Sequence, residues 1–123
     1  ILIFIHHNIT ETFLIRFQHI RLCLEKYGDG NGKLQEKEGP ALAEQMLSEL
    51  GFEKDVIERV SFLVGHHHTY TGIDGLDYQI LVEADFLVNL FEGNTDTAHI
   101  RATYDNIFRT ETGKKICREM FGL

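Results

Sequence analysis

The sequence has no tryptophan, one proline and two cysteines, and it has no apolar run long enough for a membrane span. A membrane-spanning helix needs roughly 18 or more consecutive apolar residues, so we expect no membrane partner. Cys23 and Cys117 lie far apart in apolar, helix-like segments. Two cysteines allow one disulfide, but the absence of a wider cysteine framework favours a reduced pair and a cytoplasmic location.

Basic residues are also few. The chain has 12 lysines and arginines and 19 aspartates and glutamates, so its formal net charge is −7. An acidic chain repels phosphate backbones, so we expect no nucleic-acid polymer as a partner. A small phosphorylated substrate would require a metal cation to offset its charge. The length of 123 residues fits one compact domain, and 43% hydrophobic residues is an ordinary globular composition.

Helical periodicity dominates the chain, and glycines separate the periodic segments. The spacing of apolar residues predicts helices over residues 36–50, 53–64, 77–91, 95–109 and 114–121, with Pro40 in the first turn or so of the first helix. Residues 13–24 could form a further helix, and residues 1–5 fit a short strand equally well. We predict an all-α, compact helical bundle of about five to six helices, forming a single domain over residues 1–123.

Three consecutive histidines, His66, His67 and His68, follow Gly65 where a predicted helix ends. Because the helix ends there, their rings should fan out from one point instead of lining one helical face. Neutral imidazole is a good ligand for Zn, Fe, Mn and similar ions, and histidine also serves in acid–base catalysis. The alternative is a solvated polar loop. We treat the three histidines as a candidate metal-binding or catalytic cluster.

Asp85 lies in the middle of the predicted helix 77–91, between apolar neighbours on both sides. A buried carboxylate is costly unless it is paired or ligates a metal, which makes Asp85 a second candidate. The alternative is that Asp85 faces solvent or caps a neighbouring helix. Glu83 points to another side of the helix, and we expect it to be exposed. The segment after the histidines offers three groups that fit either a site rim or a solvated loop, namely Tyr70, Asp74 and Asp77.

The segment YGDGNGKLQEKE at residues 27–38 partly matches a twelve-residue calcium loop. Asp29, Asn31 and Glu38 fall at positions where such a loop has ligands. Tyr27, however, occupies the first position, where the pattern requires an aspartate. A loop rich in glycine, asparagine and aspartate is therefore the better interpretation.

From about residue 20 onward, the chain resembles the HD superfamily of metal-dependent phosphohydrolases, and especially small bacterial HD-domain proteins. The resemblance is carried by EKYG at 25–28, GKLQEKEGPALA at 32–43, LVGHHHTYTGIDGLDYQILVEADFLVNL at 63–90 and TETGKKICREMF at 110–121. It implies an all-α fold and one or two divalent transition-metal ions such as Fe, Mn or Zn. It also implies that Asp85, His66 and His67 bind metal, and that His67 and His68 take part in catalysis, where a histidine could protonate the leaving group.

The sequence departs from the family at the His-Asp dyad that names it. Counting back without gaps from residues 25–28 places the dyad at Arg16 and Phe17, neither of which can ligate a metal. The family's early histidine would precede Ile1, so residues 1–19 look atypical or incomplete. Missing early helices would leave the apolar face of helix 77–91 uncovered, which would favour a partner or a homodimer.

Two functions follow from this comparison of residues with the family. The first is hydrolysis of a small phosphorylated metabolite or nucleotide by metal-activated water, supported by the histidine cluster and Asp85. The second is a catalytically degenerate HD-like binding or regulatory domain, supported by the missing dyad.

Overall fold

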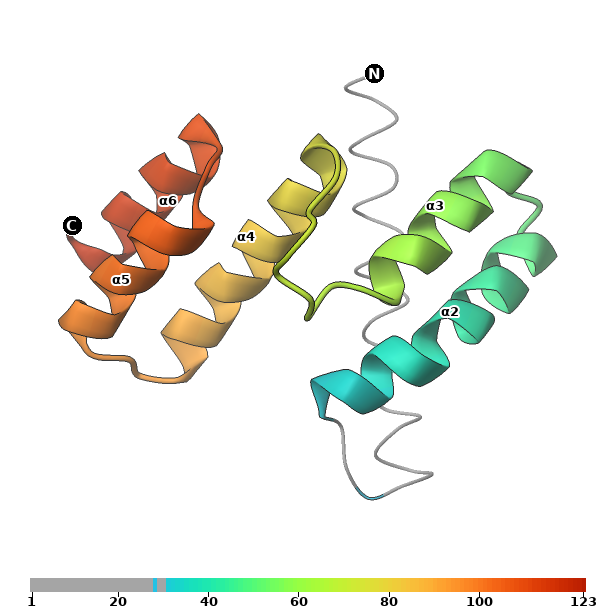
Figure 1. Cartoon of the computed structure of the whole chain (residues 1–123), viewed down its shortest axis with the longest axis horizontal. Coiled ribbons are helices and arrows are strands. Elements are labelled where there is room, and N and C mark those ends of the chain that lie inside the picture. Colours follow the sequence, from blue (N-terminus) through green and yellow to red (C-terminus); the bar gives the residue numbers. More distant parts are fainter. Residues whose placement is uncertain (1–27, 29–30) are drawn as a thin grey trace. The chain divides into compact units, whose positions relative to one another are not determined.

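The computed structural model describes residue 28 and residues 31–123. Within this part every regular element is an α-helix: α2 (Gly32–Glu49), α3 (Lys54–Val64), α4 (Leu76–Glu92), α5 (Thr97–Ile107) and α6 (Glu111–Phe121) (Figure 1). The predicted all-α class is confirmed. None of these helices is long and apolar enough to cross a membrane. The helix or strand proposed before residue 25, Cys23, and the Arg16 and Phe17 positions lie outside the described residues.

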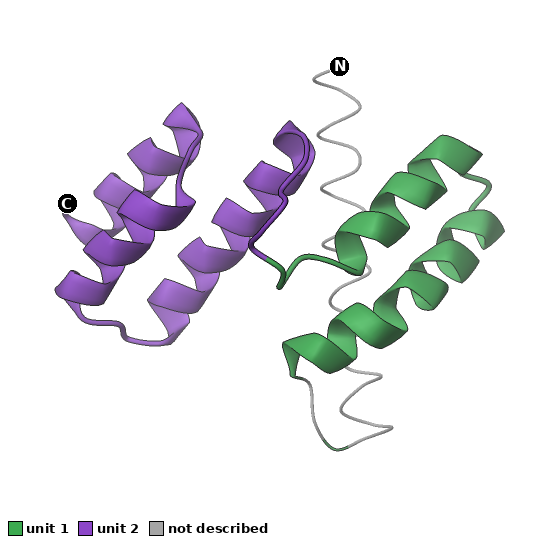
Figure 2. Ribbon diagram, viewed as in Figure 1, with its two compact units in different colours: residues 1–69 green, residues 70–123 purple. Residues whose placement is uncertain are grey.

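The chain divides into two compact units, residues 1–69 (unit 1) and residues 70–123 (unit 2) (Figure 2). Among the described helices, α2 and α3 belong to unit 1, whereas α4, α5 and α6 belong to unit 2. The predicted site residues are divided in the same way, since His66, His67 and His68 lie in unit 1 and Asp85 lies in unit 2. A single domain over residues 1–123 stays a prediction.

The first described helix, α2, begins at Gly32 and not at the predicted residue 36. Its N-cap is Asn31, whose side-chain Oδ1 accepts a hydrogen bond from the backbone N–H of Leu34 at 3.0 Å. Such a cap satisfies one of the N–H groups that a helix start leaves without an intrahelical partner. Apolar periodicity missed this start because Leu34 is the only apolar side chain in the first turn. The earlier start places Pro40 in the helix interior, beyond the predicted first turn.

The early start of α2 also affects the calcium-like segment at residues 27–38. Residues 32–38, the second half of the calcium-like segment, belong to the helix. A calcium loop must instead wrap around the ion and present a backbone carbonyl from its seventh position. The helical conformation of residues 32–38 differs from that arrangement, whereas Tyr27 and Asp29, which belong to the first half of the pattern, lie outside the described residues.

Unit 1 is built on a helical hairpin in which α2 and α3 pack side by side (Figure 1). Its buried core is aliphatic and comes from both helices: Ala43, Leu47, Val56, Val60 and Val64. The valines of α3 recur every fourth residue, which places them on one face of the helix. The turn between the helices contains Gly51 at a φ of 78°, a left-handed conformation that favours glycine. This core fixes the C-terminal end of α3, where the histidines begin.

Unit 2 has its own core, formed by α4, α5 and α6. Its buried residues are Leu90, Ile100, Phe108 and Cys117, with partly buried apolar residues packed around them. Two of its helices start at side-chain caps. Asp96 Oδ1 accepts from His99 N at 3.0 Å, and Thr110 Oγ1 accepts from Gly113 N at 3.0 Å. These caps explain why α5 begins after residue 95 and why α6 begins before residue 114.

Cys117 has a buried thiol that should resist chemical modification in the folded protein. Cys117 is free and fully buried, and burial raises the pKa of its thiol although the nearby Arg118 charge opposes the shift. Only the thiolate is nucleophilic. In a Cys23→Ser background, we expect native Cys117 to react with iodoacetamide at mildly alkaline pH far more slowly than the urea-unfolded chain. Equal labelling rates in the two states would contradict this description of the core.

The same pKa shift sets the sign of a pH effect on stability. Because the folded thiol has the higher pKa, its contribution is fully present below the pKa of the unfolded thiol. The contribution is lost as pH rises through the folded pKa. The denaturation midpoint of the Cys23→Ser protein should therefore fall more steeply at alkaline pH than that of the Cys23→Ser, Cys117→Ala protein.

Candidate functional site

The predicted histidine cluster lies in the turn that follows α3 in unit 1. α3 ends at Val64 with Gly65 as its C-cap, as the sequence predicted. The three rings occupy different environments, because His66 is exposed, His67 is only 2% exposed and His68 is half-buried. One histidine of the run is therefore a core residue, and the solvated-loop alternative describes only part of the cluster.

The first two histidines share one hydrogen-bonding pattern. Nδ1 of His66 lies 2.7 Å from the carbonyl oxygen of Phe62, and Nδ1 of His67 lies 2.8 Å from the carbonyl oxygen of Val64. A carbonyl oxygen can only accept, so Nδ1 carries the proton in both rings. In the neutral ring the lone pair then resides on Nε2. Metal-binding histidines commonly use this arrangement, in which a backbone carbonyl fixes the tautomer and the ring orientation.

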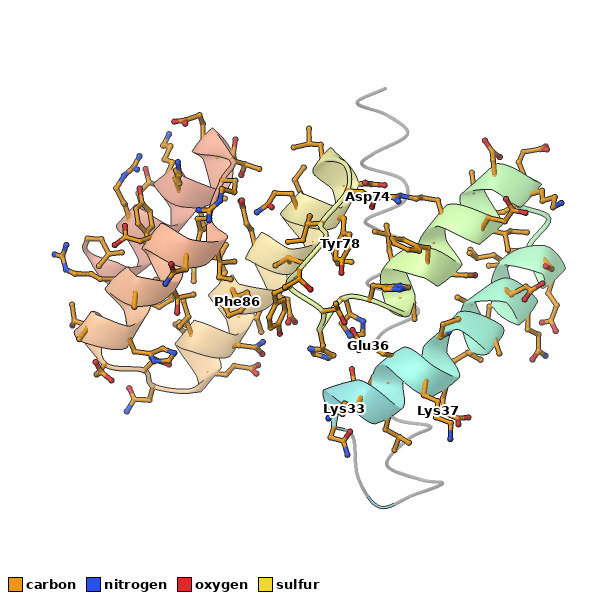
Figure 3. All side chains as sticks on the ribbon, viewed as in Figure 1. Lys33, Glu36, Lys37, Asp74, Tyr78 and Phe86 are labelled. Atoms are coloured by element: carbon orange, nitrogen blue, oxygen red, sulfur yellow. The ribbon has the colours of Figure 1, made fainter. Side chains whose placement is uncertain are left out.

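Glu36 holds the end of the histidine run against α2. Its Oε1 accepts hydrogen bonds from the backbone N–H of His68 at 2.9 Å and from the Thr69 hydroxyl at 3.0 Å. Figure 3 shows Glu36 on the side of α2 that faces the end of α3. Hydrogen bonds to an ionised carboxylate are stronger than neutral ones, so this contact stabilises the turn that carries the histidines.

The ring of His68 packs directly on the start of α2. Its Nε2 lies 3.4 Å from Oε1 of the buried Gln35, and its ring centroid lies 4.0 Å from that of His67. A Cβ at Gly32 would come within 2.6 Å of His68 Cδ2, so the ring requires a glycine there. Sequence reasoning missed Gly32, Gln35 and Glu36 as supports of this turn. No local pattern links them to residues more than 30 positions later.

Asp85 is fully buried in α4 of unit 2. The side-chain amide of Asn89, one turn later, donates to Asp85 Oδ2 at 3.1 Å. The solvent-facing alternative for Asp85 is therefore wrong. A carboxylate in such surroundings must be met by donors or by a cation.

Glu83 was predicted to be exposed, and that prediction is wrong because its side chain is only 2% exposed. Its Oε1 accepts from Arg109 N at 2.6 Å, from Thr110 N at 2.9 Å and from Gln79 Nε2 at 2.7 Å. Its Oε2 accepts from the Thr110 hydroxyl at 2.5 Å. These donors compensate the cost of burying the charge. Glu83 thereby ties the start of α6 to α4, where a negative charge also complements the helix dipole.

The three candidate rim residues have unlike surroundings within unit 2. Tyr70 is 40% exposed, and its ring centroid lies 4.8 Å from that of Phe86. Asp74 is exposed, as expected of a rim or loop group. Asp77 is only 7% exposed, and its Oδ1 lies 2.9 Å from the backbone N–H of Tyr78. Asp77 therefore belongs to the interior at the start of α4.

His66 and His67 both carry on Nε2 the lone pair that a divalent transition metal requires, and Nε2 of His67 is buried. Residue 28 and residues 31–123 contain no group of three or more His, Cys, Asp or Glu side chains that could hold an ion. The candidate ligands His66, His67 and Asp85 come from different units. A common ion bound by all three stays a prediction.

Gly113 lies against the side chain of Glu83, so even a methyl side chain at this position should destabilise the protein. A Cβ at Gly113 would overlap Glu83 Oε2 and would also approach Thr110 Oγ1 to 2.9 Å. In an ordinary helix, Gly→Ala stabilises by about 0.5–1 kcal/mol. Here we expect Gly113→Ala to lower the free energy of unfolding by about 1–3 kcal/mol, because the carboxylate must leave its donors. Chemical denaturation measures this change.

The sign of the effect is the test, since a gain in stability would contradict the described position of Glu83. Thr112→Ala is the matched control, because it adds an alanine at the neighbouring, exposed position of the same helix. We expect the control to change stability by less than about 0.5 kcal/mol.

Comparisons with known proteins identified no relative of this chain. No protein-family model, no curated protein and no solved structure matches the chain. The HD-superfamily resemblance therefore rests on the motifs around the histidine run and Asp85, and it stays a prediction.

Proposed function

We propose that the chain is a metal-dependent phosphohydrolase of HD type that acts on a small phosphorylated metabolite or nucleotide. The observation that carries the proposal is the pair of Nδ1 hydrogen bonds from His66 and His67 to main-chain carbonyls. That pattern leaves Nε2 as the donor nitrogen for an ion. The net charge of −7 adds support, because an acidic protein needs a cation to accept a phosphorylated substrate.

In this proposal, His66 and His67 hold Fe, Mn or Zn through Nε2, and Asp85 is the carboxylate ligand that the resemblance assigns. A bound ion would supply an activated water molecule and would offset charge on the phosphoryl oxygens. His68, whose ring lies beside that of His67, is the candidate proton donor to the leaving group. Glu36 positions His68 through its backbone N–H. We propose a cytoplasmic location, because charged phosphorylated metabolites do not cross membranes unaided.

The second candidate function is an HD-like binding or regulatory domain without hydrolase activity. The observation that favours it is the presence of Arg16 and Phe17 where the family has its His-Asp dyad. A guanidinium group stays cationic and a phenyl ring has no donor atom, so neither replaces a metal ligand. Such a domain could still bind a metal or a phosphorylated ligand at the histidine turn.

Metal analysis of purified protein tests the proposal directly. After supplementation with Fe, Mn or Zn and removal of loose ions, we expect stoichiometric retention of one of these metals. His66→Gln and His67→Gln should each lower metal affinity by at least about tenfold, because each removes a nitrogen ligand. Asp85→Asn is measured separately, since it reports whether the carboxylate of unit 2 belongs to the same ion.

His99→Gln is the matched control, because His99 is an exposed histidine on α5 and the metal proposal does not use it. Its metal content should equal that of the unchanged protein. A wild-type protein without bound transition metal would overturn the proposal. Stoichiometric metal without metal-dependent release of phosphate from a panel of nucleotides and sugar phosphates would favour the binding domain instead.

A further inference from the structure

A small hollow between α5 and α6 lies wholly within unit 2 and is used by neither function discussed above. It has a volume of about 180 Å³ and is lined by Arg101, Tyr104, Asp105, Arg118 and Leu123. Helices α5 and α6 supply the two arginines, Tyr104 and Asp105, and they run side by side (Figure 1), while Leu123 follows the end of α6. The lining contributes two guanidinium groups and one carboxylate, so its formal charge is positive in a chain of net charge −7.

One of the two guanidinium groups is held in place by an anchored aromatic ring. Arg118 Nη1 donates to the Tyr104 hydroxyl at 2.5 Å, and Arg118 Cζ lies 5.9 Å from the centroid of the Tyr104 ring. Tyr104 in turn stacks on Phe108, which is fully buried, with 6.1 Å between ring centroids. The position of Arg118 is therefore set by contacts that reach the core of unit 2. A guanidinium placed in advance loses less side-chain entropy when it binds an anion.

The other guanidinium group, that of Arg101, has no hydrogen-bonding partner within the described part of the chain. Among residue 28 and residues 31–123, the Arg101 side chain makes no hydrogen bond and no ion pair, although Asp105 follows one turn later on α5. An arginine that lines a hollow without an ionic partner offers its donors to a ligand. Arginine suits this role because its planar fork matches the oxygen atoms of phosphates and carboxylates.

We propose that this hollow binds a phosphate group, either as the free ion or as the head of a small phosphomonoester. Arginines from two helices can donate to different oxygens of a tetrahedral dianion. A planar, singly charged carboxylate can use only one arginine fork. It therefore gains less electrostatic attraction to offset the repulsion from the Asp105 carboxylate. The volume is below the roughly 300–1,000 Å³ typical of pockets for drug-sized ligands, which favours a small anion over a whole nucleotide.

Anion titration followed by ¹H–¹⁵N NMR tests this site in the full chain, after chelator treatment and removal of the chelator. The probes are inorganic phosphate, glycerol 3-phosphate and acetate at constant low ionic strength. We expect saturable shifts at Arg101, Tyr104 and Arg118 with both phosphates, and weaker binding of acetate. Tighter binding of one of the two phosphates identifies the free ion or the organic ester as the preferred source.

Arg101→Gln and Arg118→Gln should each raise the dissociation constant for phosphate by about tenfold or more. The matched control is Lys115→Gln, which removes the same charge from an exposed position of α6 and should leave the constant nearly unchanged. Should Arg118→Gln unfold the protein, Arg101→Gln still tests the site, because Arg101 makes no internal ion pair among the described residues.

Absence of saturable shifts, equal binding of acetate, or an equal loss in Lys115→Gln would overturn the proposal. The titration uses metal-free protein and measures binding, so its failure would leave the proposed hydrolase function unaffected. Conversely, loss of metal binding in the histidine variants would leave this site unaffected, because its residues lie outside the histidine turn.

Discussion

One carboxylate oxygen, Oε1 of Glu36, accepts hydrogen bonds from both the His68 N–H and the Thr69 hydroxyl. This contact closes the turn after α3 against the start of α2, and the orientation of the histidine run depends on it. With the main chain of the turn fixed, His66 and His67 can donate Nδ1–H to carbonyls at the end of α3. A backbone restraint thus selects the tautomer of two side chains, and the tautomer determines which nitrogen is available to an ion.

In unit 2, the carboxylate of Glu83 likewise accepts hydrogen bonds from a segment that lies far away in the sequence. A buried carboxylate is stable there because two backbone N–H groups, one hydroxyl and one side-chain amide surround it. The two backbone donors belong to the segment that leads into α6, whose N–H groups have no intrahelical partner. In both units a glutamate on one helix satisfies donors in a segment far away in sequence. These carboxylates therefore organise the two units, while the aliphatic cores supply most of the burial.

Apolar periodicity predicted the five described helices, because each helix buries a stripe of apolar side chains that recurs with the helical repeat. The ends were less predictable, since Asn31, Asp96 and Thr110 determine them through single side-chain caps. The burial of Asp85 followed from its apolar neighbours. The burial of Glu83 did not, because three of its four donors come from residues 109 and 110, which local spacing cannot identify. The role of Glu36 was not predicted either, because its donors come from His68 and Thr69, more than 30 positions later in the chain.

We propose that His66 and His67 bind a metal ion through Nε2. ¹⁵N NMR of the imidazole groups, at a pH where the rings are neutral, tests this claim most directly. We predict that both rings are protonated on Nδ1, and that added Zn²⁺ shifts the Nε2 resonances of these two histidines but not those of His99. Protonation on Nε2, or Nε2 resonances of His66 and His67 that do not respond to metal in the folded protein, would contradict the account.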